Sequence, residues 1–223
     1  MPKTLLLICL FLPWLLSAQL VNIETQRIQS DSTQFVLNAD FGFDHSNNDG
    51  VTVNQIQATI TTQIRSKDLK KTYLLLGNYN LVDADEGNLQ NSWFLHGRFN
   101  YSIDKLIKLE AFLQGQYNQL LVVRQRNLIG AGVRFNWIDR KNFTGHLGNS
   151  YMYEVEYNDT LRSKSYNHRN STYSSFSYTS SSRNFMLTNT FYYQPLYRNL
   201  DDYRLLEQFR FDFPLNKWLK FFA

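Results

Sequence analysis

The amino-acid sequence predicts an all-β fold, an antiparallel up-and-down transmembrane β-barrel. Three observations predict it: an N-terminal secretory signal, a hydrophobic period of two along nearly the whole chain, and connections that alternate between short and long. The period is clearest over residues 35–43 and 55–65, where most alternate side chains are apolar and those between them are polar. Such alternation gives an extended segment one apolar and one polar face.

Residues 1–18 have the composition of a secretory signal peptide. Lys3 gives a basic start, residues 5–16 are nearly all apolar, and Ala18 precedes the expected cleavage site. The apolar run has about a dozen residues, whereas a membrane-spanning helix needs about 20. We therefore expect a signal (1–18), a periplasmic lead-in (19–32) and one barrel domain (33–223). The only cysteine, Cys9, lies in the signal, so we expect no disulfide and no thiol chemistry in the mature chain.

The composition agrees with alternating strands. The mean hydropathy of -0.40 is that of a polar chain, and barrel strands average to such values because their two faces differ. The chain has 17 Phe, 14 Tyr and only 4 Pro, which favours strands and membrane interfaces. The net charge of +4 comes from scattered residues without a basic block, so we expect no nucleic-acid partner.

We predict ten strands from the alternation. They cover residues 35–43, 55–65, 72–81, 92–103, 108–118, 128–137, 143–157, 171–179, 185–194 and 203–213. Residues 219–223 resemble the start of an eleventh strand, because the turn before them is similar to residues 104–109. An open edge leaves backbone groups unsatisfied in lipid. We therefore expect the sequence to be truncated and the complete barrel to have twelve strands.

The predicted connections fall into two alternating classes. The short ones are residues 66–71, 104–107, 138–142, 180–184 and 214–217. The long ones are residues 45–52, 82–91, 119–127, 158–168 and 195–202. Short turns on one side and long loops on the other are typical of outer-membrane barrels, which would place residues 45–52 outside the cell.

Polar residues occupy the face opposite the apolar one, and we expect them to line the barrel lumen. The charged candidates are Asp40, Arg65, His96, Arg98, Lys108, Glu110, Arg134, His146, Glu154, Glu156, Arg210 and Asp212. Because the two signs balance, we interpret them as a salt-bridged lumen of a structural barrel. A narrow polar pore stays open as a second interpretation. We predict no catalytic, cofactor-binding or metal-binding residues.

Three polar residues fall on the otherwise apolar face. Asn149 and Asn189 lie in the middle of their predicted strands, and Glu207 lies closer to a strand end. A β-bulge or a change of register exchanges the faces of a strand, so we expect one or the other at these positions.

Two other functional classes deserve comparison with the barrel hypothesis. A lipase-like outer-membrane enzyme would need a nucleophile beside a base, but Ser150 and His146 are about 13 Å apart along an extended strand. The chain also lacks a Gly-x-Ser-x-Gly elbow. A soluble ligand-binding barrel of lipocalin type would turn the apolar face inward, but such barrels have about eight strands.

Acidic residues in two predicted loops could bind calcium. One group is Asp44, His45 and Asp49, and the other is Asp83, Asp85 and Glu86. Solvated acidic loops are the simpler interpretation, so no metal site is predicted.

Four segments resemble a family of bacterial outer-membrane proteins of unknown function, whose named member is a salt-induced outer-membrane protein. They are YLLLGNYNL (73–81), FLHGRFNY (94–101), LIGAGVRF (128–135) and YMYE (151–154). The Leu-Ser-Ala-Gln ending of the signal and the Tyr- and Asn-rich strands are similar to members from the Bacteroidetes. The resemblance implies a barrel in the outer membrane of a Gram-negative cell and transfers no catalytic residue. The expected partners are outer-membrane lipid, lipopolysaccharide and the outer-membrane assembly machinery, with no cofactor.

Overall fold

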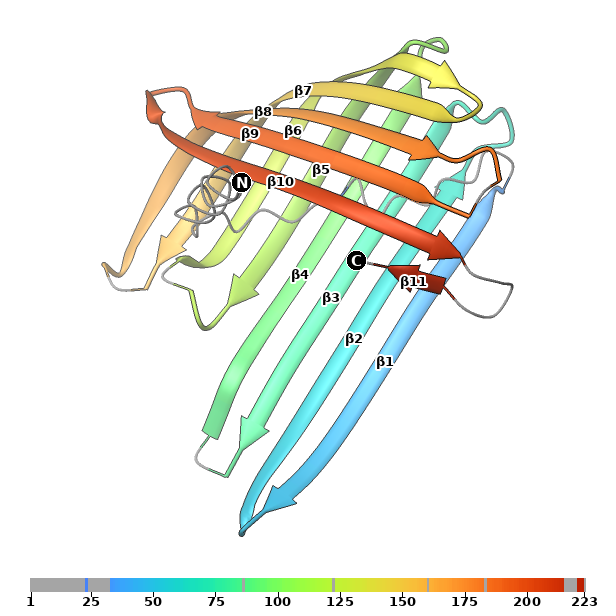
Figure 1. The fold of residues 1–223 in the computed structure, drawn as a ribbon. Helices are drawn as coiled ribbons and strands as arrows, with labels where there is room; N and C mark the ends of the chain where they lie inside the picture. Colours follow the sequence, from blue (N-terminus) through green and yellow to red (C-terminus); the bar gives the residue numbers. More distant parts are fainter. Residues whose placement is uncertain are drawn as a thin grey trace, which may run out of the picture.

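A single antiparallel sheet makes up the computed structural model (Figure 1), which describes residues 23, 33–85, 87–121, 123–159, 161–182, 184–214 and 220–222. Its strands are β1 (Phe35–Asn48), β2 (Val51–Arg65), β3 (Lys71–Ala84), β4 (Gly87–Ser102), β5 (Ile107–Asn118), β6 (Val123–Arg140), β7 (Phe143–Asn158), β8 (Ser163–Thr179), β9 (Met186–Leu196), β10 (Asn199–Pro214) and β11 (Lys220–Phe222). Each strand pairs with its neighbours in sequence. The described residues contain no helix long and apolar enough to cross a membrane.

The predicted all-β, up-and-down architecture is confirmed. All ten predicted strands are present, and β11 continues the meander through three residue pairs with β10, from Asp212↔Phe222 to Pro214↔Lys220. Within the described residues β1 pairs only with β2, so the sheet is curled but not closed. The predicted signal (1–18) and all of the predicted lead-in (19–32) except Ile23 lie outside the described residues.

The predicted long loops are wrong, because the strands continue through most of those residues. Residues 45–52 form the ends of β1 and β2 around a two-residue turn, in which Asp49 and Gly50 have φ values of 52° and 85°. Positive φ at both positions is the type I′ geometry that an Asp-Gly pair favours, and this turn matches the twist of a hairpin. Between β9 and β10 only Tyr197 and Arg198 remain outside the strands. The polar residues at these strand ends resemble loop residues in the sequence. The strands continue through them because the backbone hydrogen bonds of paired strands form with either polar or apolar side chains.

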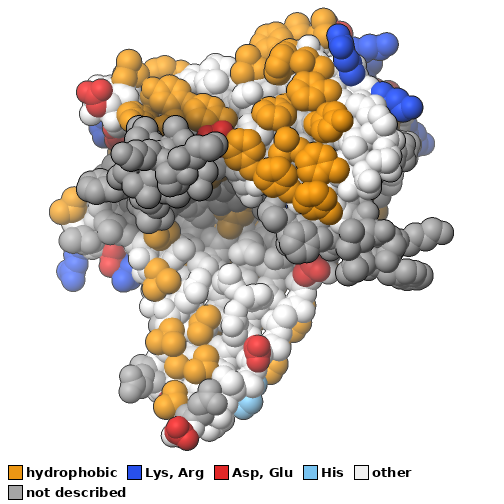
Figure 2. All heavy atoms as spheres, in the orientation of Figure 1, with side chains coloured by type: hydrophobic (Ala, Val, Ile, Leu, Met, Phe, Trp, Pro, Cys, Tyr) orange, Lys and Arg blue, Asp and Glu red, His pale blue; other side chains and the backbone are white. Residues whose placement is uncertain are grey.

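The two faces of the sheet differ in the way that the alternation predicts. On the outer, convex face large apolar side chains are exposed, for example Leu113 (59%) and Ile129 (61%). On the inner, concave face charged and polar side chains are buried, for example Glu154 (0%) and Arg169 (2%). Figure 2 shows hydrophobic side chains gathered over the outer surface of β8–β10, while the inner surface of β1 and β2 carries few of them. Exposure and polarity are therefore inverted relative to a water-soluble fold.

Neither of the predicted irregularities, a bulge or a register change, occurs at Asn149, Asn189 or Glu207. The register is continuous at all three positions, and each side chain lies on the outer face. Asn149 Nδ2 donates a hydrogen bond of 2.8 Å to Oγ1 of Thr172. Asn189 Nδ2 donates one of 3.4 Å to Oε1 of Glu207. Polar groups on this face are thus paired with each other across strands, which lowers the cost of their position and makes a bulge unnecessary.

Candidate functional site

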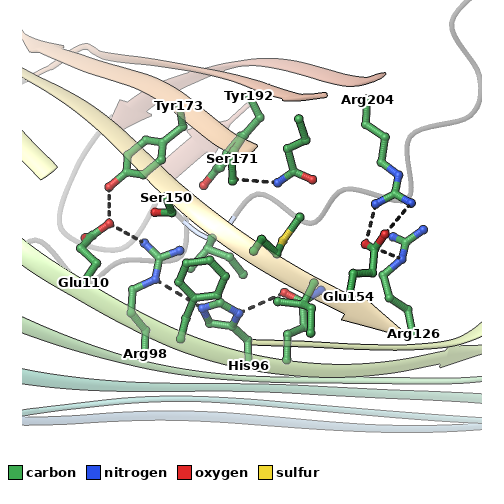
Figure 3. Close-up of a pocket in the computed structure, with 16 residues that line it drawn as sticks. His96, Arg98, Glu110, Arg126, Ser150, Glu154, Ser171, Tyr173, Tyr192 and Arg204 are labelled. Carbon is green, nitrogen blue, oxygen red and sulfur yellow. Dashed lines mark hydrogen bonds and ion pairs between the residues drawn. The ribbon is translucent and has the colours of Figure 1, made fainter. Parts of the chain in front are cut away.

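A cavity lies on the inner side of the curled sheet, between β4–β6 and β7–β10 (Figure 3). It encloses about 540 Å³ of space, part of which is open to solvent. Side chains from seven consecutive strands line it, from His96 in β4 to Arg204 in β10. The period of two places these side chains on one face, and the curl of the sheet brings them together. Two groups of charged residues occupy opposite ends of the cavity.

The first group is centred on Glu154, and we call Arg126, Glu154, Glu156, Arg169 and Arg204 the Glu154 network. Arg204 is bidentate on Glu154, with Nη1 2.6 Å from Oε2 and Nη2 3.2 Å from Oε1. Arg169 Nε donates to Oε1 of Glu154 at 3.1 Å. Arg126 Nε lies 2.6 Å from Oε1 of Glu156 and 3.4 Å from Oε2 of Glu154. Hydrogen bonds between guanidinium groups and a carboxylate are charge-assisted, and they are stronger than hydrogen bonds between neutral groups.

The Glu154 network connects strands that are not neighbours in the sheet. Arg204 reaches from β10 past β9 and β8 to Glu154 and, at 2.5 Å, to Glu156 in β7. Arg169 in β8 also contacts Asp202 in β10, with Nη2 2.9 Å from Oδ1. Removing charges from water costs several kcal/mol per ion unless each is paired and hydrogen-bonded. The network therefore forms only when the sheet is curled enough to bring β10 opposite β7.

The second group is centred on Glu110, and we call Arg98, Glu110, Arg134 and Tyr173 the Glu110 network. The Tyr173 hydroxyl donates to Oε2 of Glu110 at 2.8 Å and accepts from Nη1 of Arg134 at 3.2 Å. Arg98 Nη1 lies 3.7 Å from Oε2 of Glu110. Tyr173 belongs to β8 and Glu110 to β5, so this group also bridges strands that do not pair.

Aromatic rings in the cavity lie over glycines of the adjacent strand. Phe112 lies over Gly130 and Tyr173 over Gly148, and a Cβ atom at either glycine would overlap the ring. The register makes both pairs direct cross-strand partners. Because interiors are close-packed, the missing side chain on one strand is what admits the large ring on the next. Gly148 thus determines the position of the Tyr173 ring, and so the place where its hydroxyl meets Glu110.

An apolar group adjoins the charged residues. Ile23 is 3% exposed and packs with Leu74, Leu76 and Phe94, and it lines the cavity. The predicted lead-in therefore reaches the inner face of the sheet at Ile23. Beside this group, the ring of His96 stacks on Phe94, and its Nδ1 lies 3.0 Å from Oε1 of Gln114.

The structure brings half of the predicted lumen residues together. His96, Arg98, Glu110, Arg134, Glu154 and Glu156 belong to the two networks or contact them. The others lie elsewhere on the sheet. Nδ1 of His146 lies 2.9 Å from Oδ1 of Asn136, and Arg210 pairs with Asp212 within β10 at 3.1 Å. Asp40 is exposed on the edge strand β1, while Arg65 and Lys108 lie outside the cavity lining.

Sequence reasoning missed three arginines and one tyrosine of the networks. Arg126 and Arg169 fell in or beside predicted long loops, which the structure shows to be strand. Arg204 has the same parity as the candidates Arg210 and Asp212, so the alternation already indicated its face. Tyr173 was missed because the serine-rich segment of β8 obscures the period of two.

The two networks hold strands that do not pair in place relative to one another. Carboxylates in the Glu154 network accept hydrogen bonds from several guanidinium groups. Among the described residues no three His, Cys, Asp or Glu side chains gather as metal ligands would, and this includes the described members of the two acidic loop segments.

Comparison with known proteins places the chain in a family. No curated protein and no solved structure matches the sequence. A family model described as "Protein of unknown function, DUF481" matches residues 45–222, which covers the sheet from the end of β1 to β11 and includes every residue of the two networks. The chain therefore belongs to the DUF481 family.

Proposed function

We propose that this protein is an integral β-barrel of the Gram-negative outer membrane, with a structural role and a lumen closed by buried ion networks. The observation that carries the proposal is the inverted distribution of side chains. Large apolar residues are exposed along the outer face, whereas charged residues such as Glu154, Arg169 and Asp212 are almost completely buried inside. Hydrocarbon is the solvent in which that arrangement is favourable.

Further support comes from the sequence and from a comparison of fold types. A soluble barrel of lipocalin type would turn its apolar face inward, which is the reverse of the observed orientation. The predicted secretory signal and the resemblance to a family of outer-membrane proteins favour the same location. Lipid tolerates no free strand edge, so the free edges of β1 and of β10–β11 would each have a strand partner in the membrane, as in the twelve-stranded barrel expected from the sequence. Folding would then depend on the outer-membrane assembly machinery.

The closed lumen is inferred from the span of the two networks. Arg204 joins β10 to β7, and Tyr173 joins β8 to β5, so charged side chains cross the interior instead of lining a wide passage. Charges of opposite sign lie in contact within both groups, where three arginines face Glu154 and Glu156 and two face Glu110. The proposal includes no catalytic activity.

Two measurements test the proposal. Cell fractionation with heat-modifiable gel mobility should find a folded, outer-membrane protein, and recovery from the soluble periplasm would contradict the membrane location. Reconstitution into planar bilayers should then show no stepwise conductance over a range of voltages. Reproducible single-channel steps would overturn the closed lumen and indicate the narrow pore instead.

A further inference from the structure

An apolar groove crosses the outer face of the sheet from β3 to β7. Its floor is formed by small residues, of which Ala111 and Ala131 are direct cross-strand partners. Tyr73 and Phe99 stand at one end with ring centroids 5.1 Å apart, and Tyr151 stands at the other. The groove encloses about 1020 Å³, part of it open, and its lining is almost entirely apolar.

A polar cluster adjoins the groove at Tyr151, and we define it as Asn149, His168, Asn170, Thr172 and Tyr197. The Tyr151 hydroxyl contacts Nδ1 of His168, and the ring of Tyr151 stacks on that of Tyr197 at 6.1 Å. Asn170 Nδ2 lies 3.4 Å from the hydroxyl of Tyr197, and Asn149 Nδ2 donates to Oδ1 of Asn170 at 3.1 Å. These groups lie on the outer face, where isolated polar side chains are costly in hydrocarbon.

The groove and the polar cluster follow one line across the sheet. The register joins Tyr73, Phe99, Ala111, Ala131, Tyr151 and Asn170 as successive cross-strand partners from β3 to β8. Tyr73 follows the β2–β3 turn at one rim of the sheet, where the strands end, whereas Tyr197 lies in the β9–β10 turn at the opposite rim. The line therefore runs from the rim of the β2–β3 turn, where it is apolar, toward the rim of the β9–β10 turn, where it is polar.

We propose that this surface binds one glycolipid of the outer leaflet, with an acyl chain in the groove and the hydroxyl-rich headgroup on the polar cluster. The proposal rests on the outer-membrane location proposed above. The expected periplasmic lead-in before β1 would place the β1–β2 and β9–β10 turns at the outer rim, because the strands run up and down in sequence order. The line then matches a lipid whose headgroup lies at that rim and whose chain descends into the membrane. Amide, imidazole and hydroxyl groups exchange hydrogen bonds with sugar hydroxyls, and the two tyrosine rings offer flat faces to a sugar ring.

Native mass spectrometry of the full chain in a zwitterionic detergent tests the proposal, with lipid A and phosphatidylethanolamine as probes. The wild type should retain lipid A at least tenfold better than phosphatidylethanolamine. Ala131→Phe, which fills the groove, should abolish retention of lipid A, and Asn170→Ala should weaken it about tenfold. Ala58→Phe is the matched control, because Ala58 is an outer-face alanine of β2 outside the groove, and it should bind as the wild type does.

Other outcomes overturn the proposal. Equal retention of the two lipids, or no effect of Ala131→Phe and Asn170→Ala, would show ordinary lipid contact. A dimer that Ala131→Phe abolishes would identify a second copy of the chain as the occupant. Heat-modifiable mobility is measured for every variant, and Asn170→Ala keeps the test valid if Ala131→Phe does not fold. A wild-type protein that fractionates to the outer membrane but shows no lipid preference contradicts this inference alone.

Discussion

At the scale of single residues, Glu154 is the carboxylate that joins the three arginines of the Glu154 network. It is fully buried and contacts arginines from β6, β8 and β10. Breaking a buried ion pair leaves the remaining charges uncompensated in a medium that solvates them poorly. The buried arginines are therefore stable only while the carboxylates compensate their charges, and loss of one carboxylate should destabilise the whole network.

Glu154→Gln is expected to lower the free energy of unfolding by about 3–5 kcal/mol, because it leaves Arg126, Arg169 and Arg204 around a neutral amide. Urea titration of the detergent-folded protein, read by heat-modifiable mobility, measures the change. Asp159→Asn is the control, since it breaks a pair with Arg124 at 3.0 Å whose side chains are 40% and 39% exposed. Such an exposed pair contributes about 0–1 kcal/mol. Equal effects of the two substitutions would contradict a structural role for the Glu154 network.

At the scale of strands, the pairing of glycine with an aromatic ring sets how neighbouring strands pack. Gly148 in β7 and Tyr173 in β8 are direct partners, and the ring occupies the place of the missing side chain. The same relation holds between Phe112 in β5 and Gly130 in β6. A large inward side chain on one strand thus requires a glycine on the next, which couples two positions that are far apart in sequence.

Gly148→Ala is expected to destabilise the protein by about 1–3 kcal/mol, because the added methyl group forces the Tyr173 ring to move from Glu110. Gly42→Ala serves as the control, since its added Cβ would meet only the Cβ of Gln57 at an ordinary 3.8 Å. The control should change stability by less than about 0.5 kcal/mol. Unfolding midpoints in urea give both values, and a neutral Gly148→Ala would show that the ring has room to shift.

At the scale of the whole molecule, the apolar outer face and the polar inner face of the sheet would meet different solvents in the proposed membrane. Residues of one strand, three positions apart, lie on opposite faces, so β2 offers an internal comparison. Ile60 is on the outer face and 40% exposed, whereas Gln57 is on the inner face. Both residues are near the middle of the strand, and they differ mainly in which solvent they would meet.

Ile60→Arg is expected to cost about 2–4 kcal/mol and to impair assembly, because it places a charge in the hydrocarbon of the proposed membrane. Gln57→Arg should be much milder, since it adds a charge to an interior that already holds many. Folded fraction by heat-modifiable mobility, together with the amount recovered in outer membranes, provides the comparison. A larger loss with Gln57→Arg than with Ile60→Arg would mean that the two faces are inverted.

The sequence by itself determined the strand count and the two faces, because the period of two is a local property of an extended chain. The alternation within each strand identifies its polar face, and this placed Glu110, Glu154 and Arg134 on the inner face. Where the period is obscured, as in the serine-rich part of β8, the prediction was weakest. Strand ends were also mispredicted, because backbone pairing continues through polar residues that resemble a loop.

Only the tertiary structure decided which charges meet. Arg204 and Glu154 are 50 residues apart and belong to strands that do not pair, so their contact depends on how far the sheet curls. The same curl and register align Ala111, Ala131 and Tyr151 into a groove and bring Asn170 to its end. Local sequence carries the direction of each side chain, whereas the curvature that brings distant strands together comes from the summed twist and packing of the whole sheet.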